Sequence, residues 1–352
     1  MKNLIALIFL LSFCQLGCGQ KAPESSKASS NEEAPITASN QEKITAQNYI
    51  QKEIKFIKPS TGTEYYFSIR SNQCFYEILV NDVPVYRRFE ESSVITPVCL
   101  NSYINQSGKQ LLTYRLYPQH SAAIGEEFKH LTENTYIKIE LVGRKETDRI
   151  TAFKNQQVVL KHTSATKTDG KTFIEAGKDY YEYTVPFEAE VPYTLSTLAD
   201  SEDLSKLDQK LLLKKTEEAY RYYWNLIKGK KMDDYFRLGF KSDVDEIVSS
   251  YVHQEDLEAI EDADKFYFLI PEFKLKPLEN HRMRLYGNGK IVCLEQTSED
   301  AKLKNRSPIW GEAQLSGGEL STKFYKLYLH IPKGKSTFEI LYKNTRFTGF
   351  DD

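Results

Sequence analysis

The chain has 352 residues, of which 40% are hydrophobic and 27% are charged, and its formal net charge is −2 at pH 7. These proportions are ordinary for a globular protein and exclude a collagen-like or wholly disordered chain. A charge this close to zero produces no field that would steer nucleic acid or an anionic membrane surface to the protein, so no nucleic-acid partner is expected.

The first residues have the pattern of an export signal. Lys2 gives a positive start, and residues 4–13 form an apolar run that is too short to span a bilayer, which needs ~20 residues. Gly17 and Cys18 follow, as at the cleavage site of lipoprotein signal peptidase. This segment resembles the signal of a bacterial lipoprotein precursor, with one departure, because Gln15 stands where such signals usually carry an aliphatic residue.

The resemblance implies a modification and a location. Residues 1–17 would be removed as a signal peptide, and Cys18 would receive diacylglycerol and become a lipid-anchored N-terminus. Lipoproteins held at the inner membrane often carry Asp after this cysteine, whereas this chain has Gly19. The resemblance therefore favours the outer membrane of the cell envelope, on its periplasmic or surface face. An ordinary secretory signal is the alternative.

A polar stretch follows the signal. Residues 18–47 are rich in Gln, Ser, Ala, Glu and Asn, and their only large apolar residues are Ile36 and Ile44. Such a stretch buries too little apolar surface to offset its chain entropy, so it predicts a disordered tether. At about 5–6 Å × √n, some 27 residues would hold the folded part ~30 Å from the lipid on average.

Residues 48–195 favour a β-sandwich domain. Residues 74–80 alternate, Asn81 and Asp82 tolerate the left-handed backbone of a tight turn, and residues 83–88 continue the pattern, which predicts a hairpin. Further strands are expected at residues 111–117, 136–142, 150–153 and 158–161. Many short strands at such spacing are typical of a β-sandwich.

The last strand of this region has a distinct pattern. Residues 180–193 are rich in aromatic side chains and are interrupted by Pro186 and Pro192. Proline cannot donate to a strand ladder, so an edge strand or a crossing strand is expected here.

Three cysteines remain after the signal and Cys18. Cys74 and Cys99 can pair as a disulfide in an oxidising compartment, or they can be two small buried thiols. Cys293 lies in an expected strand, where a buried free thiol is the simpler interpretation.

Residues 200–262 predict a helical segment between two β regions. Leucines at helical spacing lead to Gly229, which stands where a C-cap would. Ser242, with Asp245 three residues on, resembles a capping box that starts a second helix. A short third helix is expected at residues 255–262.

Strands return over residues 263–352, which we expect to form a C-terminal β domain. The apolar run at 266–270 predicts a buried strand, and Asn288-Gly289 is the strongest hairpin signal available. The last strands are expected at residues 324–331 and 336–342. The predicted fold class is therefore mainly β with a helical insert (α+β).

The two β regions share a weak repeat. Residues 108–114 and 334–340 both read G-K-x-x-apolar-x-apolar, a turn that leads into an alternating strand. This pattern loosely resembles that of jelly-roll and galactose-binding-like sandwich domains, which implies that a glycan ligand is possible.

Motifs for catalysis are almost absent. The chain has no G-x-S-x-G, H-E-x-x-H, P-loop or G-x-G-x-x-G sequence. Ser164 and Lys167 match S-x-x-K, but that motif needs a helix start and residues 163–170 are polar and loop-like. The six histidines have no metal-binding spacing, and no C-x-x-C remains in the mature chain. The sequence therefore predicts no catalytic residue, metal site or cofactor.

Aromatic side chains are the remaining candidates for binding. Tyr181 and Tyr223 stand in aromatic clusters at residues 180–183 and 220–224, where strand pairing and helix packing are the simpler interpretations. Trp310, flanked by Pro308 and Gly311, is expected in a loop. Long loops of a sandwich usually carry its binding function, so Trp310 is the first choice for mutation.

Three functions remain open. The leading hypothesis is a lipid-anchored, non-enzymatic interaction protein with a protein partner, acting in envelope assembly or in the neutralisation of a toxin. The second is a glycan-binding module. The third is a hydrolase with a catalytic set dispersed in sequence, which would bring two or more Asp, Glu, His, Ser or Lys side chains into one pocket.

Overall fold

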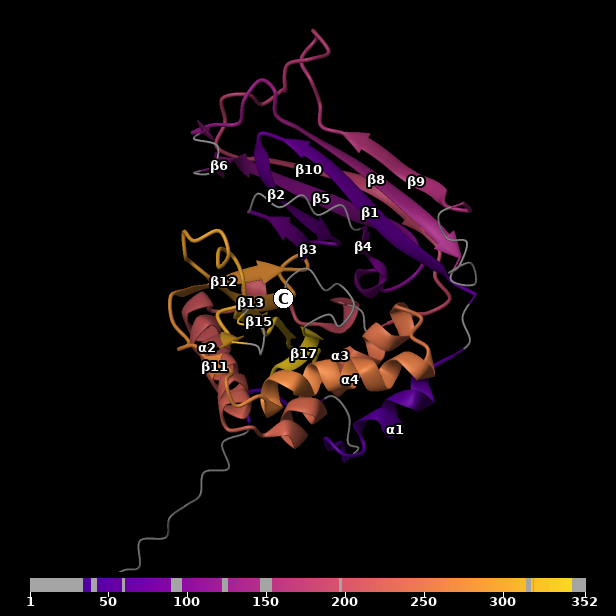
Figure 1. Ribbon diagram of the computed structural model, residues 1–352, viewed down its shortest axis with the longest axis vertical. Coiled ribbons are helices and arrows are strands. Elements are labelled where there is room, and N and C mark those ends of the chain that lie inside the picture. Colours follow the sequence, from indigo (N-terminus) through magenta and orange to yellow (C-terminus); the bar gives the residue numbers. More distant parts are fainter. Residues whose placement is uncertain are drawn as a thin grey trace, which may run out of the picture. The chain divides into compact units, whose positions relative to one another are not determined.

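Antiparallel strands dominate the computed structural model of the chain (Figure 1). The structure describes residues 34–38, 43–58, 61–89, 97–121, 126–145, 154–195, 198–314, 318 and 320–343. The described residues all belong to one compact unit. The described residues contain four antiparallel sheets of three or four strands and a few helices, which confirms the predicted β-rich class.

Two four-stranded sheets come from the first β region. Sheet I has the order β4-β1-β8-β9, formed by β4 (Val98–Cys99), β1 (Thr63–Asn72), β8 (Tyr136–Lys145) and β9 (Gln157–Thr163). Sheet II has the order β10-β5-β2-β3, formed by β10 (Tyr181–Ala189), β5 (Gly108–Pro118), β2 (Cys74–Val80) and β3 (Val83–Arg88). A short ladder joins β6 (His120–Ser121) and β7 (Glu126–Glu127). The strand expected at residues 150–153 lies outside the described residues.

Sheets I and II share a core, because alternate strand residues point to the same face. Ile137 and Ile139 of β8 are buried between exposed neighbours, and Leu112 and Tyr114 of β5 alternate in the same way. The hydroxyl of Tyr114 lies 3.1 Å from Nε2 of His162 in β9, so a side chain of sheet II reaches sheet I.

Two further sheets come from the C-terminal region. Sheet III has the order β11-β14-β15, formed by β11 (Lys274–Leu275), β14 (Trp310–Gln314) and β15 (Leu320–Phe324). Sheet IV has the order β12-β13-β16-β17, formed by β12 (His281–Tyr286), β13 (Ile291–Gln296), β16 (Leu327–His330) and β17 (Glu339–Lys343). Trp310 therefore begins a strand, and its expected place in a loop is wrong.

The local turn signals are confirmed. Asn81 and Asp82 have φ values of 51° and 61°, and they join β2 to β3 as a tight hairpin. Asn288 and Gly289, with φ of 54° and 83°, turn β12 into β13. Pro186 lies in β10, which is an edge strand of sheet II, as the missing N–H of proline requires.

In the described part of the chain, one short helix precedes sheets I and II in sequence, and three longer helices follow them. The helices are α1 (Tyr49–Glu53), α2 (Gln209–Lys228), α3 (Met232–Ser249) and α4 (Gln254–Leu269), with short 3₁₀ turns at Ile54–Phe56, Asn101–Tyr103, Leu198–Asp200 and Leu204–Lys206. Asp208 caps the start of α2 by accepting from the backbone N–H groups of Lys210 and Leu211. Gly229 follows the last residue of α2 at the C-cap, as predicted.

Two helix predictions are wrong. Ser242 lies inside α3 rather than at a helix start, and its hydroxyl accepts from the backbone N–H of Lys343 instead of capping. Residues 266–270 do not form a strand, because α4 continues through Leu269. A continuous apolar run does not distinguish a buried strand from the end of a helix, and here the helix-forming residues before it extend the helix.

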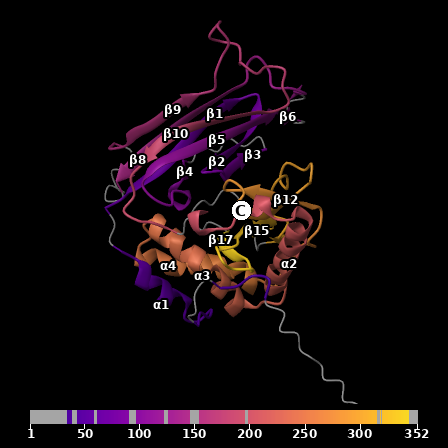
Figure 2. The same ribbon diagram turned by 180° about the vertical axis from the view of Figure 1, so that it is seen from behind.

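The helices pack on sheet IV and on one another. Helix α2 lies against β13, α3 lies against β17, and α1 lies against α3 and α4 (Figure 2). Lys343 Nζ lies 2.7 Å from a carboxylate oxygen of Asp243 in α3, and both side chains are buried. The hydroxyl of Tyr49 also donates to Asp243, so α1, α3 and β17 meet at one buried charge pair.

Part of the predicted tether is folded onto this region. Ile36 forms a parallel bridge with Phe338, and the backbone N–H of Thr37 donates to the carbonyl of Phe338 at 2.9 Å. Ile36 is 1% exposed and Ile44 is fully buried. The two large apolar residues of residues 18–47 are thus core residues, which a composition-based prediction of disorder overlooks.

Candidate functional site

An aromatic groove with a volume of about 530 Å³ could hold a ligand. That volume lies within the roughly 300–1,000 Å³ typical of ligand sites. The groove is formed by the second half of α2, the end of α4 and the segment 270–278 that leads through β11. Helix α2 buries Tyr223 and Ile227 in the core, and this orientation brings Trp224 to the groove.

The polar atoms of the aromatic walls are already bonded within the protein. The indole N–H of Trp224 donates to the carbonyl of Lys276 at 2.8 Å. The hydroxyl of Tyr267 lies 2.7 Å from Oγ of Ser321, and the Tyr267 and Phe273 ring centroids are 5.3 Å apart. The walls therefore offer ring faces and aliphatic surface rather than free hydrogen-bonding groups.

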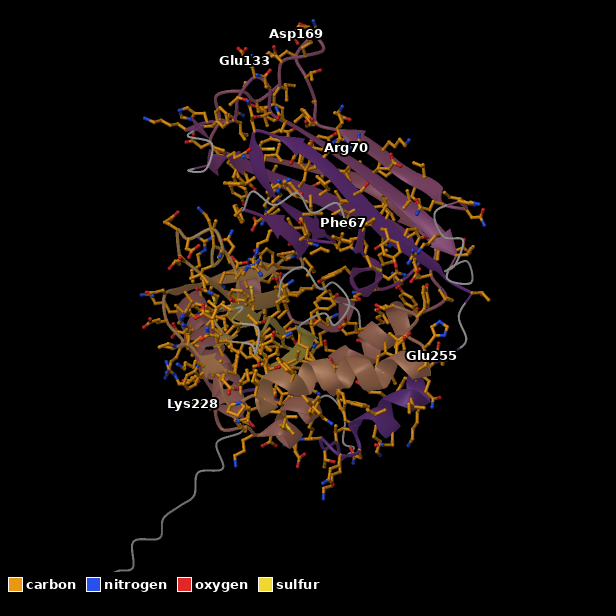
Figure 3. The ribbon with its side chains drawn as sticks, in the orientation of Figure 1. Phe67, Arg70, Glu133, Asp169, Lys228 and Glu255 are labelled. Carbon is orange, nitrogen blue, oxygen red and sulfur yellow. The ribbon has the colours of Figure 1, made fainter. Side chains whose placement is uncertain are left out.

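The rim of the groove is basic. Arg221, Lys228 and Lys230 line it and are exposed (Figure 3 labels Lys228). Lys228 Nζ lies 4.7 Å from the ring centroid of Trp224, a cation–π contact. None of the three has an ion pair with a described residue. The groove can therefore attract an anionic ligand whose body is apolar.

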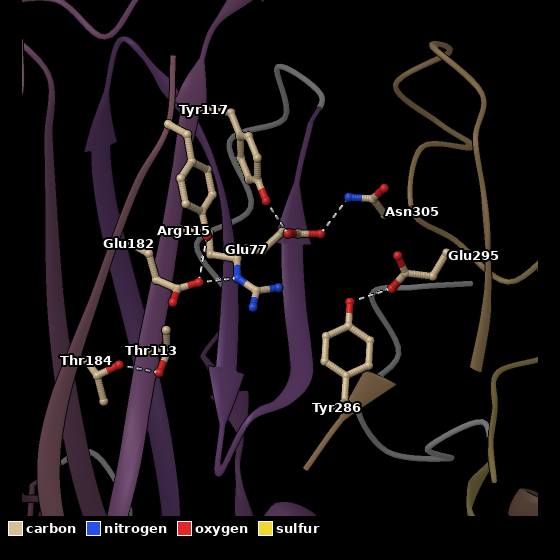
Figure 4. Close-up of polar contacts among 10 residues, drawn as sticks. Glu77, Thr113, Arg115, Tyr117, Glu182, Thr184, Tyr286, Glu295 and Asn305 are labelled. Atoms are coloured by element: carbon tan, nitrogen blue, oxygen red, sulfur yellow. Dashed lines mark hydrogen bonds and ion pairs between the residues drawn. The ribbon is translucent and has the colours of Figure 1, made fainter. Parts of the chain in front are cut away.

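A second candidate is a buried polar network between sheets II and IV (Figure 4). We call this the junction network, formed by Glu77, Tyr117, Tyr286, Glu295 and Asn305. Glu77 accepts from the hydroxyl of Tyr117 at 2.7 Å and from the side-chain amide of Asn305 at 2.9 Å. Glu295 accepts from the hydroxyl of Tyr286 at 2.6 Å. Both carboxylates are buried, at 6% and 5% exposure.

Burial raises the pKa of Glu295 above its usual value of 4.5. The hydrogen bond from Tyr286 opposes this rise in pKa, the neighbouring carboxylate of Glu77 adds to it, and Arg87 and Arg284 oppose it. Burial likewise raises the pKa of the hydroxyl of Tyr286 well above 10, so that it stays a donor. Hydroxyl and amide groups of the junction network thus donate to its two carboxylates, and burial disfavours the charged forms of Tyr286 and Glu295.

The cavity beside the junction network is small. It has a volume of about 30 Å³, and Glu77, Glu295, Ser307 and Lys326 are among its lining residues. Such a volume has room for only about one or two water molecules. Several polar side chains do converge here, as the hydrolase hypothesis requires, but the space for a substrate is lacking.

On the other side of Glu77, a charged ladder links β5 and β10. Arg115 lies 2.6 Å from Glu182, which also accepts from the hydroxyl of Tyr180 at 2.6 Å, and the hydroxyls of Thr113 and Thr184 lie 2.8 Å apart (Figure 4). Arg115–Glu182 and Thr113–Thr184 are cross-strand pairs of sheet II, Tyr180 bonds Glu182 two residues along the chain, and the threonine and tyrosine contacts are exposed. They stabilise strand pairing and offer no enclosed site.

The structure does not bring the predicted binding residues together. Tyr223 is 1% exposed and packs against Tyr235 in the core, while Tyr181 is half-buried and stacks near Tyr183. Trp310 is half-buried and stacks on Phe324, with ring centroids 5.7 Å apart. Trp310 does lie near the groove, because Lys276 contacts the Trp310 ring through its ammonium group and accepts from Trp224 through its carbonyl.

The groove residues that the sequence analysis missed come from α4 and the segment after it. Tyr267, Phe268 and Phe273 were assigned to a buried strand or to no element. The signal that could have found them is Pro271. Proline cannot continue a helix, so an aromatic run just before a proline can be the end of a helix, as it is in α4.

Of the two alternatives for Cys74 and Cys99, the structure has the free thiols and not the disulfide. Cys74 and Cys99 are free thiols in the structure, and so is Cys293. The Cys74 thiol contacts the carbonyl of Tyr136 at one end of β8, whereas Cys99 is paired with Tyr66, which lies opposite Val142. Six residues along a strand correspond to about 20 Å, far beyond the ~7 Å limit for bridged Cα atoms.

Membrane and metal features were sought in the described residues. Cys18 lies outside them. No helix among them is long and apolar enough to cross a membrane. They also contain no group of three or more His, Cys, Asp or Glu side chains that could hold a metal ion. No family model, curated protein or solved structure matches the chain.

Proposed function

We propose that this protein is a lipoprotein of the bacterial cell envelope that binds a protein partner through the aromatic groove and catalyses no reaction. The groove carries the proposal, because it combines large aromatic side chains with exposed cations, the residue types that contribute most to protein interfaces. Envelope assembly and toxin neutralisation are the two settings in which such a partner would be met.

The anchor and the layout are parts of the same proposal. Cys18 carries the lipid, residues 48–195 form a β-sandwich, residues 200–262 form a helical segment, and residues 263–352 form a C-terminal β domain. The order of the sheets and helices along the chain supports this layout. Palmitate labelling of the wild type that is absent in Cys18→Ser would support the anchor.

A glycan ligand and a hydrolase are less favoured. Sugar sites need carboxylate or amide groups that hydrogen-bond hydroxyls, and the described lining of the groove contains no Asp, Glu, Asn or Gln. The junction network has two carboxylates, but its cavity of about 30 Å³ is too small for a substrate.

A crosslinking pull-down tests the proposal. The tagged full chain carrying Cys18→Ser should capture a partner from envelope extracts, and Phe273→Ala should abolish the capture because it removes a groove wall. Tyr183→Ala is the matched control, since Tyr183 is 44% exposed and lies on β10. Two results would contradict the proposal. One is that the Cys18→Ser chain captures no partner. The other is that Phe273→Ala and Tyr183→Ala lose capture equally while their far-UV circular dichroism is unchanged.

A further inference from the structure

We infer that the groove recognises an acidic peptide segment whose aromatic or aliphatic side chains enter it between the cations of the rim. This inference rests on the proposed function and goes further, because it specifies the chemistry of the partner. It commits to a peptide ligand, and sugars and lipids become outcomes of the test.

The charge argument starts from helix spacing. Arg221, Trp224 and Lys228 lie at i, i+3 and i+7 on α2, so they share one face of the helix. Lys230 follows just beyond the helix end. This arrangement makes a cation–aromatic–cation stripe along one wall, and no carboxylate lines the groove to neutralise it. An unneutralised basic stripe favours a ligand with several carboxylates in a row.

The apolar argument comes from the opposite wall. Phe273, Pro271 and Pro277 line the groove, and Phe266 and Leu269 at the end of α4 are 42% and 63% exposed. Large side chains this exposed and this close to an aromatic groove would be removed from water by a bound segment.

The groove suits a peptide better than an acyl chain. Lys228, Pro271 and Pro277 are exposed, so the groove is open to solvent along part of its length. An acyl chain lying there would keep apolar surface in water, whereas a peptide can leave its backbone groups hydrated while its side chains enter. The about 530 Å³ of space is enough for a few large side chains.

Fluorescence anisotropy tests the inference with the full chain carrying Cys18→Ser. The probe is a fluorescein-labelled peptide in which Phe and Leu alternate with Asp and Glu. The peptide should bind, and its affinity should fall with added salt. The double variant Lys228→Glu/Lys230→Glu should bind it at least roughly tenfold more weakly, because both changes reverse exposed rim charges. Lys210→Glu/Lys215→Glu, on the exposed first half of α2, is the matched control.

Each control peptide and ligand has a defined outcome. The same peptide with Lys in place of Asp and Glu, or with Ala in place of Phe and Leu, should not bind. Three results would overturn the inference. The control peptides bind as tightly as the acidic peptide, the two double variants weaken binding equally, or galactose or phosphatidylglycerol vesicles bind instead. If the acidic peptide fails while the pull-down still depends on Phe273, the partner chemistry is wrong and the proposed function stands.

Discussion

His330 is a half-buried titratable group at the end of β16, whose other residues are buried and apolar. Its Nδ1 lies 2.8 Å from Oγ of Ser201. Burial, with a smaller contribution from the nearby ammonium groups of Lys241 and Lys335, lowers the pKa of His330 to about 4. The folded protein therefore holds His330 neutral.

This gives a pH dependence with a defined sign. The pKa of His330 is lower in the folded state than in the unfolded state. The contribution of neutral His330 to the free energy of unfolding is therefore complete above the unfolded pKa of about 6.5, and it is lost as pH falls through about 4. The loss is at most about 3 kcal/mol. Urea unfolding should show that His330→Gln loses less stability over this range than the wild type. At pH 8 the difference in the free energy of unfolding between the two proteins reports packing alone. If the free energies of the two proteins change in parallel from pH 8 down to pH 4, His330 is not the group responsible.

Element-scale packing explains a glycine in the middle of a helix. Gly239 lies inside α3, where glycine is normally unfavourable by ~1 kcal/mol relative to alanine. A Cβ at this position would lie 2.9 Å from both Cδ and Nζ of Lys343. Lys343 cannot simply move away, because its ammonium group is paired with Asp243 in the core.

Gly239→Ala should therefore destabilise the protein despite its better helix propensity. We expect a net loss of about 1–2 kcal/mol, since overpacking next to a buried ion pair outweighs the gain in propensity. Denaturant unfolding measures it. In a Lys343→Ala background the same change should become stabilising, because the steric conflict is gone. If Gly239→Ala also lowers the free energy of unfolding in the Lys343→Ala background, the contact with Lys343 is not the cause of the destabilisation.

The elements also show what could be predicted from sequence. Both hairpins were predictable because Asn81-Asp82 and Asn288-Gly289 determine backbone geometry within a few residues. The strand expected at residues 266–270 was wrong because a short run of apolar residues carries no periodicity that separates helix from strand. The groove was not predictable at all, since α2, α4 and β11 meet only through tertiary packing. Only Trp224 stood in a cluster that the sequence singled out.

On the scale of the whole molecule, the sheets of the two β regions are joined by polar contacts as well as by a common core. The two hairpin turns touch, because the backbone N–H of Asn288 donates to the Asp82 carboxylate at 2.8 Å. Asn305 donates to Glu77 nearby, and one cluster of buried apolar residues includes members of sheets I, II and IV, with Leu275 of sheet III packed against it. The change from strands to helices after β10 and the change back to strands after α4, which ends at Leu269, both fall within this cluster.

We therefore expect one cooperative unfolding transition. Both tryptophans, Trp224 and Trp310, lie in the C-terminal half, so their fluorescence reports on that half while far-UV circular dichroism reports on all sheets. The two urea curves should coincide. Glu77→Gln should lower the free energy of unfolding by about 1–3 kcal/mol, because a buried hydroxyl or amide donor loses its partner. Both urea midpoints should therefore fall together.

Glu133→Gln is the matched control, since Glu133 is exposed and makes no side-chain bond with the described residues (Figure 3). It should leave both curves at their wild-type positions. Two separated transitions in the wild type would show that the β regions unfold independently.

The bridge between Ile36 and Phe338 also determines where mechanical force would enter. A pull on the chain before Ala34 would first load Thr37 and its bond to the carbonyl of Phe338, next to the edge strand β17. Sheets I and II would bear no tension until that contact broke. The strands that begin at Thr63 follow this contact along the chain, so a pull from the N-terminal side would reach the contact before it reached them.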